Sequence, residues 1–261
     1  MPANIPTTFF EWVRFLLDKY GELFLRGTGV TLLVALVGTV LGFLIGLLVA
    51  ILRTLPLPKG SFFRKLPLRI VHFLLNVYIE VFRGTPMIVQ SMVIYYGAMQ
   101  LGVKMPVLGA AIFIVSINTG AYMAEIIRGG IISVDAGQKE ACTAIGLTHW
   151  QSMVKVVLPQ AVRNIMPSIG NEFVVNIKDS SVLNVISVGE LFFMSKSAAG
   201  AYLRYFEVFF ITACIYLVLT FTITRILRLL EKKMDGSKHY TIYGSQSDSH
   251  ASITVAEEEE A

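Results

Sequence analysis

Seven polar and charged residues occupy an otherwise apolar segment of the chain, residues 166–186. They are Asn171, Glu172, Asn176, Lys178, Asp179, Ser180 and Ser181. On a helix, Glu172, Asn176 and Asp179 fall at i, i+4 and i+7 and form one polar stripe. The cluster carries both signs of charge, as recognition of a zwitterion requires: an anion for its ammonium group, and a cation or N–H groups for its carboxylate. These residues are therefore candidates for contact with a small polar solute.

The position of this polar stripe follows from the cost of placing charge in lipid. An ionisable group inside a membrane faces the interior of a helix bundle or a water-lined cavity, because exposure to hydrocarbon is unfavourable. We therefore expect the stripe to line a translocation pathway. The alternative is structural: Lys178 and a carboxylate form an internal salt bridge that holds helices together.

A second cluster combines charges with helix-breaking residues: Glu80, Arg83, Gly84, Thr85 and Pro86. Glu80 and Arg83 are three apart, so on a helix they can pair and share their desolvation cost. Glycine and proline leave backbone groups that protein or water must satisfy. The sequence predicts a charge-paired helix break near the cytoplasmic interface. A direct role in gating or substrate contact is the alternative.

A third polar stretch lies between two apolar segments and has a regular pattern. Its patterned residues are Glu140, Ala141, Cys142, Gly146, Leu158 and Pro159. Asp135, with Gln138 three positions later, predicts a helix N-cap. Glycine permits a sharp change of direction and proline cannot continue a hydrogen-bonded helix. We therefore expect two short helical pieces, broken at Gly146-Leu147 and stopped at Pro159.

The first of these pieces has a small apolar face formed by Ala141, Ala144 and Ile145. Residues of this size give a low-relief surface that suits docking against another protein. The patterned stretch is therefore a candidate docking surface for another protein.

The composition indicates a membrane protein. The 261 residues are 54% hydrophobic and 15% charged, with a mean hydropathy of +0.65, whereas a soluble protein carries about 25% charge. Long apolar runs cover residues 30–52, 66–101, 106–123, 166–186 and 205–223. The second run is too long for one straight span and predicts a break at Gly84–Pro86. We predict an all-α integral membrane protein with about five transmembrane helices.

Basic residues predict the orientation of these helices. They gather in the segment after the first span, in the patterned stretch and after the last span. The positive-inside rule then places the amino terminus outside, and the patterned stretch and carboxyl terminus in the cytoplasm.

The two ends of the chain differ from the apolar centre. The first residues, Met1 to Thr8, carry no basic region before a short apolar core, so a cleaved signal peptide is not expected. Phe9–Tyr20 is amphipathic and predicts either an interfacial helix or a lead-in packed on the bundle. Residues 233–261 are Ser-rich, end in four glutamates and predict a disordered acidic cytoplasmic tail. We assign 1–26 to an extracytoplasmic lead-in and 27–232 to a transmembrane domain, with the coupling loop at about 129–165.

Several classes of function are disfavoured by the motifs. The chain has no phosphate-binding GxxxxGK[ST] loop, so any driving ATPase is expected to be a separate polypeptide. No nucleophile elbow or metal-ligand spacing occurs, so we expect neither an enzyme nor a cofactor or metal in this chain. The net charge of +4 is explained by membrane topology and does not indicate nucleic-acid binding.

Sequence blocks over about residues 25–230 resemble the permease subunits of bacterial ABC importers for polar amino acids. The blocks are EVFRGTP at residues 80–86, AYMAEIIRGGI at 121–131, LPQAVR at 158–163 and NIKDSSVL at 176–183. The patterned stretch resembles the EAA loop of these permeases, where the membrane subunit meets its ATPase. Cys142 replaces the usual second alanine and Val156 the usual isoleucine.

The resemblance implies a type I importer in the bacterial cytoplasmic (inner) membrane that works by alternating access. Its partners would be a cytoplasmic ATPase dimer that binds ATP and Mg, a second permease copy or relative, and an extracytoplasmic substrate-binding protein. By this analogy Glu140, Ala141 and Gly146 shape the helix that docks on the ATPase.

Two other classes remain as alternatives. A secondary transporter or channel for a small polar solute would also have apolar spans and buried charges. It would not explain a capped, glycine-broken cytoplasmic loop, and secondary carriers often have an inverted repeat. An integral membrane enzyme is disfavoured because no nucleophile or metal constellation is present.

Overall fold

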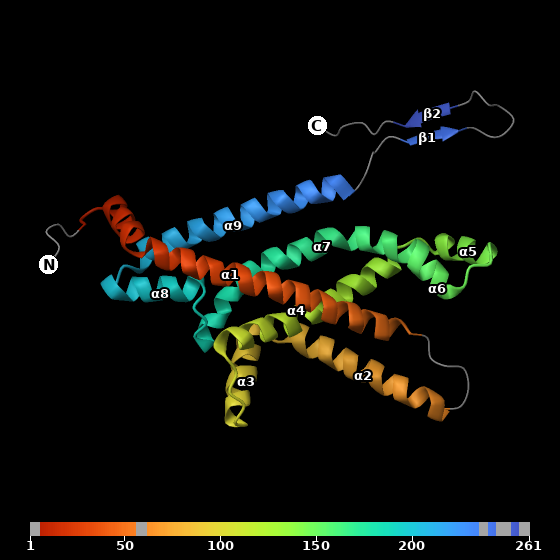
Figure 1. The fold of residues 1–261 in the computed structure, drawn as a ribbon, viewed down its shortest axis with the longest axis horizontal. Coiled ribbons are helices and arrows are strands. Elements are labelled where there is room, and N and C mark those ends of the chain that lie inside the picture. The colour runs from red at the N-terminus through yellow and green to blue at the C-terminus, as the bar shows by residue number, and fades with distance from the viewer. Residues whose placement is uncertain (1–5, 56–61, 235–239, 244–251, 256–261) are drawn as a thin grey trace.

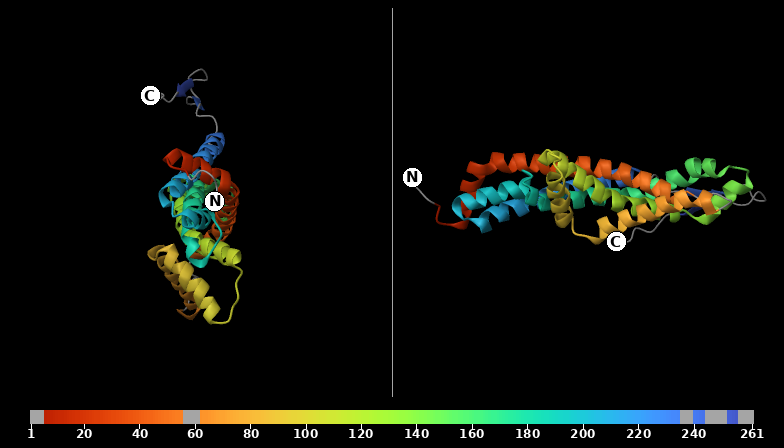
Figure 2. Two further views of the ribbon diagram at one scale, coloured as in Figure 1. Left: turned by 90° about the vertical axis from the view of Figure 1, so that its left-hand side faces the viewer. Right: turned by 90° about the horizontal axis from the view of Figure 1, so that it is seen from below.

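The computed structural model describes residues 6–55, 62–234, 240–243 and 252–255. This part of the chain forms an elongated helical bundle (Figures 1 and 2). Its helices are α1 (Phe9–Thr54), α2 (Phe62–Gly84), α3 (Met87–Gln100), α4 (Val107–Ile132), α5 (Ala136–Ala144), α6 (His149–Ser152), the π-helical η1 (Met153–Val157), α7 (Leu158–Asp179), the 3-10 helix η2 (Ser180–Ile186), α8 (Leu191–Tyr202) and α9 (Tyr205–Met234). Helices α1, α4, α7 and α9 run along the length of the bundle (Figure 1).

The central contact of the bundle joins α1 to α4. Gly38, Gly42 and Gly46 of α1 are all buried, and they repeat every four residues along one face. A Cβ atom on Gly42 would lie 2.7 Å from the Thr119 Cβ and 3.2 Å from the Gly120 amide nitrogen of α4. The two backbones therefore approach closely because these positions lack side chains. The glycine repeat therefore serves packing within the fold.

Three described helices are long and apolar enough to cross a membrane: α1, α4 and α9. A fourth span results if the bent pair of Trp150–Ile186 and Leu191–Tyr202, which meet at 56°, counts as one. The chain is not helical at Thr85-Pro86, as predicted. The 14 residues of α3 measure only about 21 Å at about 1.5 Å each. The count of five spans and the orientation of the termini stay predictions.

The amphipathic stretch near the amino terminus packs on the bundle. Thr8 and Glu11 form a capping box at the start of α1, which fixes where this helix begins. Trp12 and Leu16 are buried in one apolar cluster with residues of α8 and α9, including Leu191. The helix is continuous through residues 26 and 27, so the lead-in is the first part of the helix that contains the first apolar run.

The acidic tail contains regular structure in its described residues. Strand β1 (Tyr240–Tyr243) pairs antiparallel with β2 (Ser252–Val255). The prediction of a disordered tail is wrong for these two strands. Both contain β-branched residues, and β1 also contains aromatic ones, which favour strands locally although the surrounding composition is polar. The rest of the tail beyond residue 234 lies outside the described residues.

Candidate functional site

The candidate coupling loop begins with a capped helix, α5. The Asp135 Oδ1 atom accepts a hydrogen bond of 2.6 Å from the Gly137 amide, so Asp135 is the N-cap, as predicted. Val134 just before it is buried in the same cluster as Ile131 of α4 and Val157 of η1. The base of the loop is thus fixed to the bundle on both sides.

Helix α5 ends at Gly146 in a Schellman motif. Gly146 has a φ of +79°, a left-handed conformation that glycine adopts without steric cost. Its amide donates to the Thr143 carbonyl at 3.0 Å, and the Leu147 amide donates to the Cys142 carbonyl at 3.0 Å. These two bonds satisfy carbonyls that the helix end leaves free. The predicted break at Gly146-Leu147 is confirmed.

The second helical piece has a capping box that sequence inspection missed. The Gln151 amide donates to Thr148 Oγ1 at 3.2 Å, and the Thr148 amide donates to Gln151 Oε1 at 2.9 Å. The T-x-x-Q spacing of Thr148 and Gln151 is the sequence pattern of a capping box and could have predicted the start of α6. Helices α5 and α6 therefore form a helix-turn-helix in which the end of the first and the start of the second are both capped.

The prediction that Pro159 stops this second piece is wrong. Helix α6 continues through the π-helix η1 into α7, and Pro159 lies in the first turn of α7. At this position proline needs no hydrogen-bond donor. The π-helical register appears in the bond from the Leu158 amide to the Met153 carbonyl, five residues earlier. The Gln160 Nε2 atom donates to the nearby Val156 carbonyl at 3.0 Å.

The loop exposes the face that the sequence suggested for docking. Ala141 and Ala144 are exposed, and the exposed fractions of Ile145 and Trp150 are 76% and 72%. Cys142 is buried and packs inward. A groove of about 280 Å³ lies beside this face and includes Thr143, Leu147 and Met153. Because α5 and α6 lie at one end of the bundle (Figure 1), this surface is open to a partner.

The helix break between α2 and α3 is stabilised by two side chains that the sequence analysis did not single out. Gln90 Nε2 donates to the carbonyls of Phe82, at 3.0 Å, and Thr85, at 2.9 Å. Asn118 Nδ2 of α4 donates to the Phe82 carbonyl at 3.3 Å and to Gln90 Oε1 at 2.9 Å. The Phe82 and Thr85 carbonyls at this break are therefore satisfied by protein side chains, one of the two ways that the sequence analysis allowed.

The charges beside this break do not pair with each other. Glu80 and Arg83 are both exposed, and the four ion pairs of the described residues do not include them. The predicted Glu80–Arg83 pair is wrong because the Arg83 guanidinium instead lies over the Tyr122 ring of α4, 5.5 Å from its centroid. Arg83 also lies close enough to Glu172 to attract its charge, which links the second cluster to the polar stripe.

The polar stripe of α7 is divided by its surroundings. Asn176 is buried, and its Nδ2 atom donates to Thr39 Oγ1 of α1 at 2.8 Å and to Thr119 Oγ1 of α4 at 3.0 Å. Asn176 therefore joins three helices. Glu172 is half-buried, whereas Asp179 is exposed. Helices α1 and α4 therefore cover only the part of the stripe that contains Asn176, and the role of the stripe in a translocation pathway stays a prediction.

The other polar residues of the segment 171–181 differ in their exposure to solvent. Asn171 and Lys178 are exposed, and Ser181 is half-buried. Ser180 is buried, and its hydroxyl donates to the Ile177 carbonyl at 2.8 Å. Within the described residues Lys178 makes no salt bridge, so the alternative of an internal Lys178–carboxylate pair is not realised. Ser180 is a structural residue, and Asn171 and Lys178 are available to a ligand.

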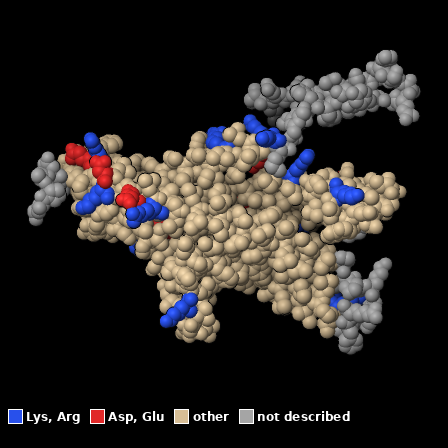
Figure 3. Space-filling view, in the orientation of Figure 1, with Lys and Arg blue, Asp and Glu red and all other residues tan. Residues whose placement is uncertain are grey.

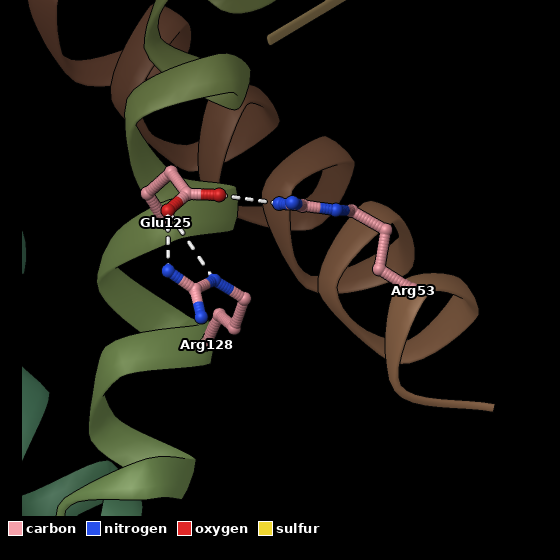
Figure 4. Close-up of polar contacts among 3 residues, drawn as sticks. All are labelled: Arg53, Glu125 and Arg128. Atoms are coloured by element: carbon pink, nitrogen blue, oxygen red, sulfur yellow. Dashed lines mark hydrogen bonds and ion pairs between the residues drawn. The ribbon is translucent and has the colours of Figure 1, made fainter. Parts of the chain in front are cut away.

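Glu125 joins two helices near the coupling loop (Figure 4). Its Oε2 atom is 2.9 Å from the Arg128 guanidinium, as the i, i+3 spacing predicts. Its Oε1 atom pairs with Arg53 at the end of α1, a contact that the sequence analysis missed. The Glu125 and Arg53 side chains are only 21% and 20% exposed, so this pair is partly shielded from water, whereas the Arg128 side chain is 40% exposed.

Comparison with known proteins identifies the family. The model of the family described as "Binding-protein-dependent transport system inner membrane component" matches residues 57–236, more than half of the chain. The chain belongs to this family. This inner membrane component is therefore a transport subunit rather than an enzyme, and as the permease of an ABC transporter it works with an ATPase partner. The family and membrane location expected from the motifs are confirmed.

Relatives of this inner membrane component match over most of their length. The probable amino-acid permease protein YxeN of Bacillus subtilis (strain 168) is 35% identical over 88% of this chain and 97% of the relative. The arginine transport system permease protein ArtQ of the same strain is 36% identical, covering 80% and 91%. The glutamine transport system permease protein GlnP of Escherichia coli (strain K12) is 36% identical, covering 81% and 93%.

Solved structures show the same fold. The crystal structure of an amino acid ABC transporter with histidines aligns with a TM-score of 0.76 and 37% identity, covering 88% of this inner membrane component and 100% of that chain. An inward-facing MetNI methionine ABC transporter aligns with a TM-score of 0.68 at 20% identity, covering 83% and 98%. The second match extends the likeness in fold to a more distant transporter.

Proposed function

We propose that the chain is the permease of an ATP-driven importer for polar amino acids. The observation that carries this proposal is the exposed helix-turn-helix of α5 and α6, rigidly capped and fixed to α4 and α7 at its base. A surface of this kind can pass movement from an ATPase to the membrane helices only if it is stiff. The named substrates of the relatives, arginine and glutamine, support an amino-acid substrate.

The proposed assembly contains two permease copies or relatives, a cytoplasmic ATPase dimer and an extracytoplasmic substrate-binding protein. ATP and Mg are bound by the ATPase dimer. Residues 137–159, including Glu140, Ala141 and Gly146, contact that dimer. Movement of the loop opens the pathway alternately to the two sides of the membrane, and the mixed charges near Arg83, Glu172 and Lys178 meet the zwitterionic part of the substrate.

Uptake into lipid vesicles tests the proposal. Vesicles that contain the permease, its ATPase and its substrate-binding protein are expected to accumulate radiolabelled glutamine or arginine only when ATP can be hydrolysed. Equal uptake in vesicles that lack the ATPase would contradict the proposal and favour a secondary transporter or channel. Absence of ATP-dependent uptake for both amino acids in the complete assembly would contradict the substrate class.

A further inference from the structure

A basic groove lies between α7 and α9, outside the residues singled out from the sequence except at Lys178. It has a volume of about 400 Å³, and its polar lining consists of Lys178, Thr220, Thr224, Arg225 and Arg228. No acidic side chain lines it. Lys and Arg side chains also gather over the carboxyl-terminal half of α9, whereas the middle of the same face is mostly uncharged (Figure 3).

The direction of the groove cations follows from helix geometry. Helices α7 and α9 run antiparallel (Figure 1), with Gly170 of α7 against Leu227 of α9. Side chains on a helix lean toward its amino-terminal end. The Lys178 side chain is therefore expected to lean toward the α6 end of α7, and the Arg225 and Arg228 side chains to lean the opposite way. Like charges that converge repel each other, and an anion between them removes the repulsion.

Neighbouring groups leave this positive charge largely uncompensated. Among the described residues, Lys178, Arg225 and Arg228 form no ion pair. The Arg225 guanidinium lies over the Phe221 ring at 4.9 Å. Asp179 lies near enough to Lys178 to attract it, but it belongs to the adjacent face of α7. Glu231 is half-buried one turn beyond Arg228 and also lies outside the groove.

The polar residues of α7 beside the groove indicate whether the groove opens to lipid or to water. Asn164, Ser168 and Asn171 are exposed there, next to Lys178. A polar face of this extent is incompatible with lipid at membrane depth. The groove therefore opens to water, and its rim is polar on the α7 side. Val174, Leu217 and Phe221 form the apolar part of the groove lining, and the cations beside them favour a ligand that carries a negative charge.

We infer that the groove between α7 and α9 is a water-filled, anion-selecting part of the translocation pathway, in which Lys178, Arg225 and Arg228 receive the carboxylate of the transported amino acid. This inference rests on the proposed function and adds α9 to the residues that contact substrate. It also defines the substrate class by its carboxylate: an amino-acid amide, which lacks that charge, is held less well. Thr224 supplies a hydroxyl group beside the cations, whereas the Thr220 hydroxyl donates to the Tyr216 carbonyl of its own helix at 2.9 Å.

Reaction of an introduced cysteine with charged reagents tests the groove directly. The full permease–ATPase complex in lipid nanodiscs would carry Cys214→Ala, which removes the exposed native thiol; Cys142 is buried. Thr224→Cys is expected to react with an anionic methanethiosulfonate roughly ten times faster than with a cationic one, because the groove concentrates anions. This preference is expected to fall toward one in Arg225→Gln and Arg228→Gln. Glutamine is expected to slow the reaction. Glutaminamide, in which the α-carboxylate is replaced by a neutral amide, is not.

Val218 provides the matched control, since it lies on the same helix, is exposed and lines an apolar groove instead. Val218→Cys is expected to react slowly with both reagents. Thr224→Cys that is as unreactive as Val218→Cys, or that prefers the cationic reagent, would overturn the inference. Equal protection by glutaminamide would overturn the carboxylate role. ATP-driven uptake by the Cys214→Ala parent tests the proposed function separately, because the reagent preference does not depend on it.

Discussion

The Asn118 Nδ2 atom of α4 donates a 2.9 Å hydrogen bond to Gln90 Oε1 of α3. Both side chains are buried or nearly so, and both also bond to the Phe82 carbonyl at the end of α2. Three helices therefore meet in one polar network at the point where the chain between α2 and α3 is not helical.

Replacing Gln90 by leucine is expected to destabilise the permease by about 1–3 kcal/mol, because the Phe82 and Thr85 carbonyls and Asn118 lose a buried partner. Thermal unfolding of the detergent-purified complex measures this loss. Gln100→Leu is the control, since Gln100 is exposed at the end of the same helix. Equal unfolding temperatures for the two variants would show that the network does not stabilise the break.

Gly146→Val is expected to uncouple the ATPase while the permease still inserts into the membrane. The φ of +79° at Gly146 costs an L-residue about 1–2 kcal/mol, and a β-branched residue more, so the Schellman turn is distorted. Co-purification of the ATPase and substrate-stimulated ATP hydrolysis are the measurements.

Gly102 provides a control for Gly146→Val, because it also has a positive φ but lies outside the coupling loop. Its φ is +80°, and it lies between α3 and α4, away from the coupling loop. Gly102→Val is expected to lower stability to a similar degree and to leave ATPase association intact. If both variants fail to co-purify with the ATPase, the effect of Gly146→Val results from general instability and not from the coupling loop.

Local signals explain why parts of the site were predictable. The Asp135 cap, the Gly146 break and the Glu125–Arg128 pair each depend on residues within a few positions of one another. Such contacts follow from helix geometry once a helix is expected.

The missed contacts are long-range. Arg53 and Glu125 are separated by 72 positions, and Asn176 and Thr39 by 137. One sequence holds no information on which helices pack together, so these partners emerged only from the fold. Pro159 was misjudged for a different reason: proline ends a helix in its interior but is accepted in its first turn, and the start of α7 was unknown.

Glu125→Gln is expected to lower the stability of the complex by about 1–2 kcal/mol, because Arg53 and Arg128 then lie close together without a shared counter-charge. Glu22→Gln is the control. Glu22 pairs with Arg26, but their side chains are 78% and 72% exposed, and a pair of this kind contributes at most about 1 kcal/mol. Urea or thermal unfolding compares the two variants. A smaller loss of stability for Glu125→Gln than for Glu22→Gln would show that the Glu125 ion pairs do not stabilise the complex.

Gly42→Val is expected to destabilise the bundle by about 1–3 kcal/mol or to prevent its assembly, since the added atoms would meet Thr119 and the backbone of Gly120. Gly29→Val serves as the control on the same helix, because a Cβ there meets no atom within 4 Å. Expression level and thermal unfolding are the measurements. Tolerance of valine at Gly42 would show that α1 and α4 separate more easily than their packing indicates.

The glycine-mediated contact between α1 and α4 has a mechanical consequence. The α4 side chains of Val115, Thr119 and Met123 fit against the three glycine positions of α1. Sliding by a fraction of a turn would bring these side chains against the larger neighbours of the glycines, so the two helices move as one rod. At about 1.5 Å per residue, the 26 residues of α4 make this rod about 39 Å long. Only Ser133, Val134 and Asp135 separate its end from α5. A push on the coupling loop therefore reaches the far side of the bundle as the swing of a stiff lever.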